Sequence, residues 1–103
     1  MNLKEMNSYI MVCDKKSITA AAESLYISPQ ALSKTIQKIE SELGVDLLIR
    51  SNNGVKVTVY GKLFYDGSKK ILQEYDSIST KIKHLSLQNR GLLSIVSAYG
   101  ILR

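Results

Sequence analysis

Residues 17–34 read Ser-Ile-Thr-Ala-Ala-Ala-Glu-Ser-Leu-Tyr-Ile-Ser-Pro-Gln-Ala-Leu-Ser-Lys, and this stretch decides the fold. Ser17 is a good N-cap, so a helix is predicted over Ile18–Leu25. The three alanines at 20–22 let another helix approach closely, because no large side chain holds the backbones apart. The stretch therefore begins with a short helix that is built to be packed upon.

A second helix follows after the short turn Tyr26-Ile27. Ser28 can cap it, and Pro29 fits its first turn, where a missing N–H costs nothing. The helix is predicted over Pro29–Leu43, and Gly44 ends it. Two helices joined by so short a turn are held at a steep angle, so one can enter a DNA groove while the other spans the backbone.

The helix over 29–43 has two contrasting faces. Its apolar stripe follows helical spacing, and the opposite face carries only polar and basic residues, with no acid until the far end. Its first two residues able to reach base edges are Gln30 and Ser33. The stripe consists of Leu32, Ile36, Ile39 and Leu43, and the polar face consists of Gln30, Ser33, Lys34, Gln37 and Lys38.

The flanking segments complete a small domain. Apolar residues at helical spacing predict a helix over Leu3–Asp14. Residues 47–50 and 55–58 are β-prone, and Ser51-Asn52-Asn53-Gly54 between them contains Asn-Gly, a strong hairpin signal. The sequence thus predicts a β-hairpin, or wing, after the helices.

A long helix is predicted over Val59–Gln88, capped by Thr58. Its apolar residues repeat at 4-3-4-3 spacing, which favours a dimer seam over the alternative that the stripe packs on its own domain. Residues 92–99 are predicted to form a strand. The seam consists of Ile71, Tyr75, Ile78, Ile82 and Leu85.

Composition narrows the function classes. The chain has 103 residues and a net charge of +5, which suits a polyanionic partner but proves none. Its single cysteine, Cys13, excludes an internal disulfide and is expected to be a buried, inert thiol. The sequence contains no apolar run long enough to span a membrane and no signal peptide, so we expect a cytoplasmic protein that does not bind a membrane. We also expect it to use no cofactor and no metal ion.

DNA binding is the chemistry that these elements favour. Gln can pair with adenine through two hydrogen bonds, lysines can meet guanine or phosphate, and capped helix starts suit phosphate. The wing can reach phosphate or a minor groove. The predicted DNA-contacting residues are Ser17, Thr19, Ser28, Pro29, Gln30, Ser33, Lys34, Gln37, Lys38, Arg50, Asn52, Asn53 and Lys56.

The residues resemble the N-terminal domain of LysR-type transcriptional regulators over positions 1–88. That family's pattern reads roughly S-F-T-x-A-A-E-x-L-x-x-S-Q-P-A-L-S-x-x-I, then L-E-x-x-L-G-x-x-L-F-x-R, then T-x-x-G. Ile18 and Leu48 replace the usual phenylalanines, and Pro29-Gln30 reverses the common order, which moves the glutamine about 100° around the helix. The positions in register are Ala21, Ala22, Glu23, Leu25, Ser28, Ala31, Leu32, Ser33, Ile36, Glu40, Leu43, Gly44, Leu47, Arg50, Thr58 and Gly61.

The resemblance implies a mainly α, winged helix-turn-helix domain with a small β-hairpin, followed by a long dimerisation helix. It implies a homodimer that binds a promoter palindrome in double-stranded DNA and a C-terminal effector domain that senses a small molecule. The expected division is 1–58 for the DNA-binding domain, 59–88 for the linker helix and 89–103 for the start of a truncated effector domain.

Three other function classes remain as alternatives. A different winged-helix regulator without a sensor domain is disfavoured by the family-like strand after Gly91. A protein–protein interaction module that uses the long helix is disfavoured by the acid-free face of the helix over 29–43. An enzyme is least favoured, because the sequence shows no paired acid and base, no Cys/His cluster and no phosphate-cradling loop.

Overall fold

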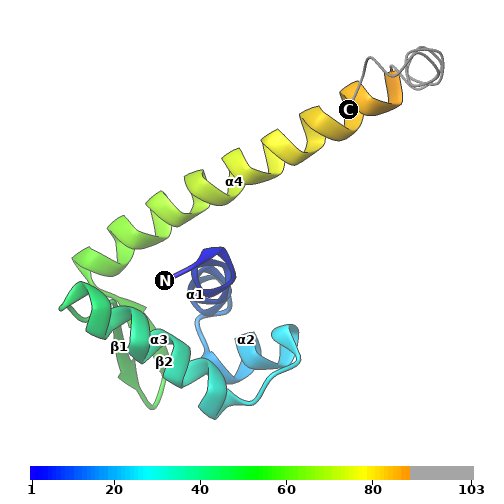
Figure 1. Ribbon diagram of the computed structural model, residues 1–103. Coiled ribbons are helices and arrows are strands. Elements are labelled where there is room, and N and C mark those ends of the chain that lie inside the picture. The colour runs from blue at the N-terminus through cyan, green and yellow to red at the C-terminus, as the bar shows by residue number, and fades with distance from the viewer. Residues whose placement is uncertain (89–103) are drawn as a thin grey trace. The chain divides into compact units, whose positions relative to one another are not determined.

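The computed structural model describes residues 1–88 and consists of two compact units, Met1–Leu72 and a second that begins at Gln73. The mainly α fold with a two-stranded hairpin and a long last helix is confirmed (Figure 1). The strand predicted over 92–99 lies outside the described residues. The elements are α1 (Leu3–Lys15), α2 (Ile18–Leu25), α3 (Pro29–Leu43), β1 (Leu48–Ser51), β2 (Gly54–Val57) and α4 (Val59–Gln88).

The helix starts follow the capping residues. The Oγ atoms of Ser17 and Ser28 each accept the backbone N–H three residues on, both at 3.1 Å. Thr58 Oγ1 likewise accepts the N–H of Gly61 at 3.0 Å. Each hydroxyl satisfies a backbone donor that the helix leaves unpaired, which is why the predicted starts of α2, α3 and α4 are confirmed.

The core lies among α1, α2, α3 and the start of β1. Ala21 and Ala22 are completely buried, so the small residues of α2 do permit the close helix approach that the sequence predicts. The apolar stripe of α3 faces this core except at its end, because Leu43 is 41% exposed. The other large buried residues include Tyr9, Val12, Leu32, Ile36, Ile39, Leu47 and Leu48.

Tyr9 joins the start of α4 to this core. Its hydroxyl donates to the Leu47 carbonyl at 3.3 Å, and its ring meets Phe64 edge to face at 5.0 Å between centroids. Gly61 passes this junction so closely that a Cβ there would strike both Leu47 O and the Tyr9 hydroxyl. The first turn of α4 is therefore fixed against α1 by a contact that only glycine permits.

The hairpin forms as predicted, but its turn differs from the one that Asn-Gly favours. β1 and β2 pair antiparallel from Leu48–Val57 to Ser51–Gly54, so the loop is Asn52-Asn53. Among the described non-glycine residues only Lys16 and Tyr26 have positive φ, whereas an Asn-Gly turn of type I′ needs positive φ at both central positions. The asparagines stay in ordinary backbone conformations, and Gly54 alone takes the unusual φ of +110°.

Cys13 differs from expectation as well. The thiol is half-buried, not buried, because α1 ends two residues later and the side chain lies at the edge of the core. Burial still raises the pKa of the Cys13 thiol, which opposes formation of the reactive thiolate.

Candidate nucleic-acid interface

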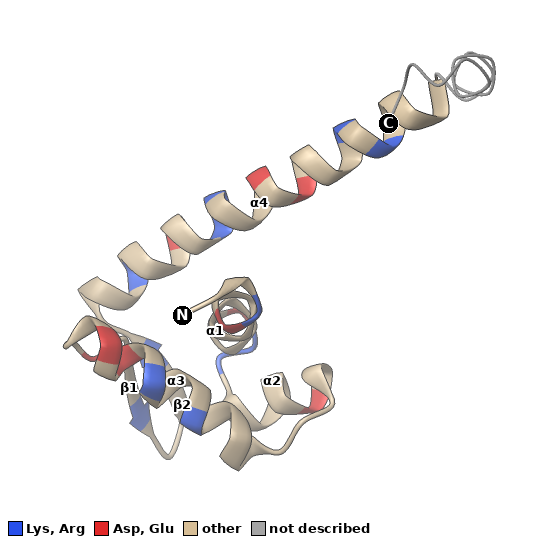
Figure 2. Ribbon diagram, viewed as in Figure 1, with Lys and Arg blue, Asp and Glu red and all other residues tan. Residues whose placement is uncertain are grey.

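The exposed face of α3 is polar and free of acids along its first two and a half turns. Gln30, Lys34 and Gln37 are exposed on the side opposite the buried Leu32 and Ile36. Figure 2 shows basic segments on this part of α3 beside basic segments of the hairpin, with acidic segments at the other end of the helix. The structure thus gathers hydrogen-bonding groups and positive charge on one side of α3.

Arg50 of β1 contacts this face directly. Its guanidinium Nη1 donates a hydrogen bond to the hydroxyl of Ser33, which is half-buried on the hairpin side of α3. The two residues are 17 apart in the chain, so only the fold brings them together. The wing and the helix therefore present one joined polar surface at this point.

The strand register separates the two basic residues of the wing. Arg50 pairs with Val55, while Lys56 pairs with Ile49. Because side chains alternate between the two sides of a strand, Arg50 shares the side of the buried Leu48 and Lys56 lies on the other side with Ile49. Arg50 and Lys56 thus lie on opposite sides of the hairpin, and Arg50 contacts α3.

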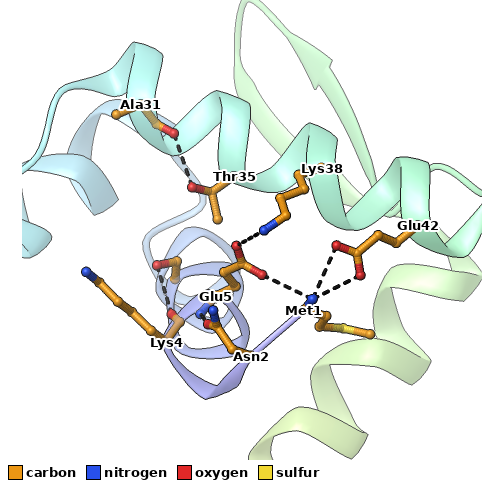
Figure 3. Close-up of polar contacts among 9 residues, drawn as sticks. Met1, Asn2, Lys4, Glu5, Ala31, Thr35, Lys38 and Glu42 are labelled. Atoms are coloured by element: carbon orange, nitrogen blue, oxygen red, sulfur yellow. Dashed lines mark hydrogen bonds and ion pairs between the residues drawn. The ribbon is translucent and has the colours of Figure 1, made fainter.

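Lys38 is turned from this surface toward α1. Its Nζ lies 2.9 Å from Glu5 Oε2, as Figure 3 shows. The hydrogen bond to Lys38 holds the pKa of Glu5 below its ordinary value, and the same bond raises the pKa of Lys38. The Lys38 side chain is 57% exposed and the Glu5 side chain only 14%, so the pair lies at the edge of the surface and Lys38 is already partly neutralised.

Free backbone donors remain at the starts of α2 and α3. Ser17 and Ser28 use their hydroxyls as caps, and Pro29 carries no N–H. Within residues 1–88, the backbone N–H groups of Ile18, Thr19 and Gln30 have no acceptor. Uncapped donors at a helix start attract anions, so these positions suit phosphate oxygens better than the capping hydroxyls do.

The wing is anchored on the turn between α1 and α2. The N–H of Val55 donates to the Lys16 carbonyl at 3.4 Å, and a Cβ built on Gly54 would lie 2.6 Å from the same oxygen. Asn52 and Asn53 at the tip are exposed. The tip therefore projects from a base that is held close to the start of α2.

Sequence reasoning missed the acidic residues that position this surface. Glu40 Oε2 accepts the N–H groups of Leu47 and Leu48 at 2.8 and 3.2 Å, which joins the start of β1 to α3. Glu5 holds Lys38. Neither partnership leaves a signal in the local sequence, because the Glu5 pair spans 33 residues and the Glu40 bonds depend on how the chain turns between α3 and β1. The resemblance did place Glu40 in register, without giving it a role.

The predicted dimer seam lies on α4 and is divided between the two units. Ile71, in the first unit, is 47% exposed and lines an apolar cavity of about 550 Å³ with Leu43, Leu63 and Phe64 among others. In the second unit Tyr75, Ile78, Ile82 and Leu85 are each at least 50% exposed. The stripe is thus accessible in the single chain.

Residues 1–88 show neither a cluster of metal-binding side chains nor a helix able to span a membrane. Residues 1–88 contain no group of three or more His, Cys, Asp or Glu that could hold a metal ion. None of the helices in this part of the chain is both long enough and apolar enough to cross a membrane.

Solved structures of similar proteins share the fold described above, a helical domain with a β-hairpin and a long last helix. A crystal structure of a BenM_DBD/catB site 1 DNA complex matches with a TM-score of 0.80 and 35% identity, over 84% of this chain and 97% of that one. Full-length BenM matches with a TM-score of 0.75 and 36% identity, over 81% of this chain and 27% of that one.

Comparison with curated proteins and family models identifies the family. The probable cat1 operon transcriptional activator of Acinetobacter lwoffii is 32% identical over 99% of this chain and 35% of its own length. The nitrogen assimilation regulatory protein nac of Klebsiella aerogenes is 34% identical over 97% of this chain and 33% of its own. The chain thus spans about a third of these relatives. Because the model for bacterial regulatory helix-turn-helix proteins of the lysR family matches residues 3–62, the chain belongs to the LysR family of bacterial transcription regulators.

Proposed function

We propose that the chain binds double-stranded DNA with the exposed face of α3 and the adjoining residues of the wing. The proposal rests on the exposed face of α3 formed by Gln30, Lys34 and Gln37, which contains no acidic residue. Arg50 adds a basic group beside this face through its bond to Ser33. DNA carries a dense negative charge, and polar side chains read its base edges in the major groove. A surface of this composition fits both requirements.

The residues divide into two roles. Gln30 and Ser33, near the start of α3, reach base edges, and Gln30 is suited to adenine. Lys34, Lys56 and the uncapped N–H groups of Ile18 and Thr19 contact phosphates and fix the register of the protein on the duplex. The match to the BenM_DBD/catB site 1 DNA complex supports DNA binding by this fold.

The chain acts as a homodimer on a promoter palindrome. One such domain covers too little DNA for a specific site, so two copies must be joined, and α4 carries the exposed apolar stripe that can join them. We divide the chain into a DNA-binding domain at 1–58, a linker helix at 59–88 and the start of an effector domain at 89–103. A small-molecule effector would bind only the C-terminal effector domain that residues 89–103 begin.

The protein works in the cytoplasm, where bacterial DNA lies.

An interaction module that uses only α4 is the competing function, and the salt dependence of DNA binding separates the two. Fluorescence anisotropy of a labelled random duplex, titrated with the chain at several salt concentrations, gives the affinity at each. Each neutralised phosphate should lower log K by ~0.9 per decade of salt. A flat response, or no binding at low salt, would leave only the interaction module.

A further inference from the structure

The bond between Arg50 and Ser33 uses one of the two acceptor lone pairs of the serine oxygen and leaves the hydroxyl hydrogen free to donate. A guanidinium has donors only, so the Ser33 oxygen must be the acceptor. The serine hydroxyl then retains its own hydrogen, which has no acceptor within residues 1–88. Thr35, two residues on, behaves differently, because its hydroxyl donates back to the Ala31 carbonyl at 3.2 Å.

The surroundings of Ser33 hold this arrangement in place. Ser33 is half-buried on the side of α3 that faces the hairpin, where Arg50 contacts it. Arg50 reaches it from the side of β1 that also carries the buried Leu48, and the start of β1 is tied to α3 through Glu40. The donor and the acceptor are thus carried by elements that are themselves fixed to each other.

We infer that Arg50 orients Ser33 as a hydrogen-bond donor, which reads base edges that offer an acceptor and selects against cytosine. The inference rests on the proposed function. In the major groove guanine, adenine and thymine each present an acceptor, whereas cytosine presents only its amino donor. A bond from a cation also polarises the hydroxyl, which makes it a better donor and makes its remaining lone pair a poorer acceptor for the amino group of cytosine.

A purely electrostatic role for Arg50 makes a different prediction. If Arg50 only attracts phosphate, lysine at that position supplies the same charge and base preference is unchanged. Lysine lacks the planar, rigid fork of arginine donors, so it does not hold the Ser33 oxygen in the same way. The Arg50→Lys variant therefore separates orientation of the serine from simple charge.

The experiment is selection of bound sequences from a library of random duplexes, followed by sequencing. Wild type, Ser33→Ala, Arg50→Lys and the double variant are compared, with Ser33→Thr as the variant that keeps the hydroxyl. In wild type, cytosine should be depleted at one position of each half-site by roughly three- to tenfold, the range expected for one hydrogen bond. The depletion of cytosine at that position should disappear in Ser33→Ala and in Arg50→Lys, and it should persist in Ser33→Thr. The double variant should show the same base preference as either single variant.

Two results would overturn the inference while leaving DNA binding intact. In one, Arg50→Lys keeps the depletion at the position that Ser33→Ala affects. In the other, the two substitutions change different positions or act additively. If wild type binds no duplex at all, the proposed function fails first and this inference fails with it.

Discussion

At the scale of single residues, similar side chains on α3 have different surroundings. Lys34 is exposed and has no partner among residues 1–88, whereas Lys38, four positions on, is held by Glu5. Arg50 faces α3 and Lys56 lies on the other side of the hairpin. Position on the fold, more than residue type, therefore decides which groups are available to a ligand.

Gln30 and Lys56 should affect DNA binding in different ways. Gln30→Ala should cost ~1–3 kcal/mol on a selected site and little on random DNA, because it removes a contact to a base edge. Lys56→Ala should weaken both by a similar factor, because a phosphate contact carries no sequence information. Competition titrations with both duplexes measure the difference, and identical behaviour of the two variants would contradict the assigned roles.

Glu5→Gln should strengthen binding to random DNA by roughly two- to threefold, because it removes the negative charge that partly neutralises Lys38. Glu74→Gln on α4 removes the same charge without touching Lys38 and is the matched control. Equal effects of the two variants would show that only net charge matters.

The Glu5 variant should also change the response of stability to acid. The folded pKa of Glu5 lies below its ordinary value of 4.5, so its contribution is present above that pH and is lost as the pH falls through the folded pKa. Thermal unfolding of wild type should therefore lose a small stabilisation on acidification that Glu5→Gln lacks. Identical acid dependence in both proteins would contradict the contact.

At the scale of elements, replacing two differently placed glycines with alanine should change the free energy of unfolding in opposite directions. Gly54→Ala should destabilise the chain by ~1–3 kcal/mol, because φ is +110° and the new Cβ would press on the Lys16 carbonyl. Gly67→Ala should stabilise it by about 1 kcal/mol, because it lies within α4 and a Cβ there meets nothing within 4 Å. Urea unfolding of both variants measures this, and shifts of the same sign would contradict it.

The helices were largely predictable from the sequence. For the wing, the sequence predicted the hairpin but not its turn geometry or its contact with α3. Ser17, Ser28 and Thr58 mark helix starts because a cap acts on backbone three residues away, which local sequence records. The bonds from Arg50 to Ser33 and from Lys38 to Glu5 depend on how separate elements pack, and local sequence does not record that. Helical spacing placed Gln30, Lys34 and Gln37 on one exposed face of α3, but it gave no partner for Ser33 or Lys38.

At the scale of the whole molecule, dimerisation through α4 should be separable from folding. Ile78→Asp should give a folded monomer, because an unpaired carboxylate in an apolar seam costs several kcal/mol, whereas the first unit keeps its own core. Thr80→Asp adds the same charge about 200° around the helix and should remain dimeric. Sedimentation at micromolar concentration decides this, and a monomeric wild type or a dimeric Ile78→Asp would place the interface elsewhere.

The most direct measurement is a comparison of two charge reversals, Lys34→Glu on α3 and Lys4→Glu on α1, in their affinity for a random duplex at ~0.1 M salt. Both lysines are exposed, and at this salt a charge farther than ~10 Å from the duplex is largely screened. If α3 faces the DNA, Lys34→Glu should weaken binding by about tenfold or more and Lys4→Glu by far less. Equal losses in the two variants, or a greater loss in Lys4→Glu, would contradict binding through α3.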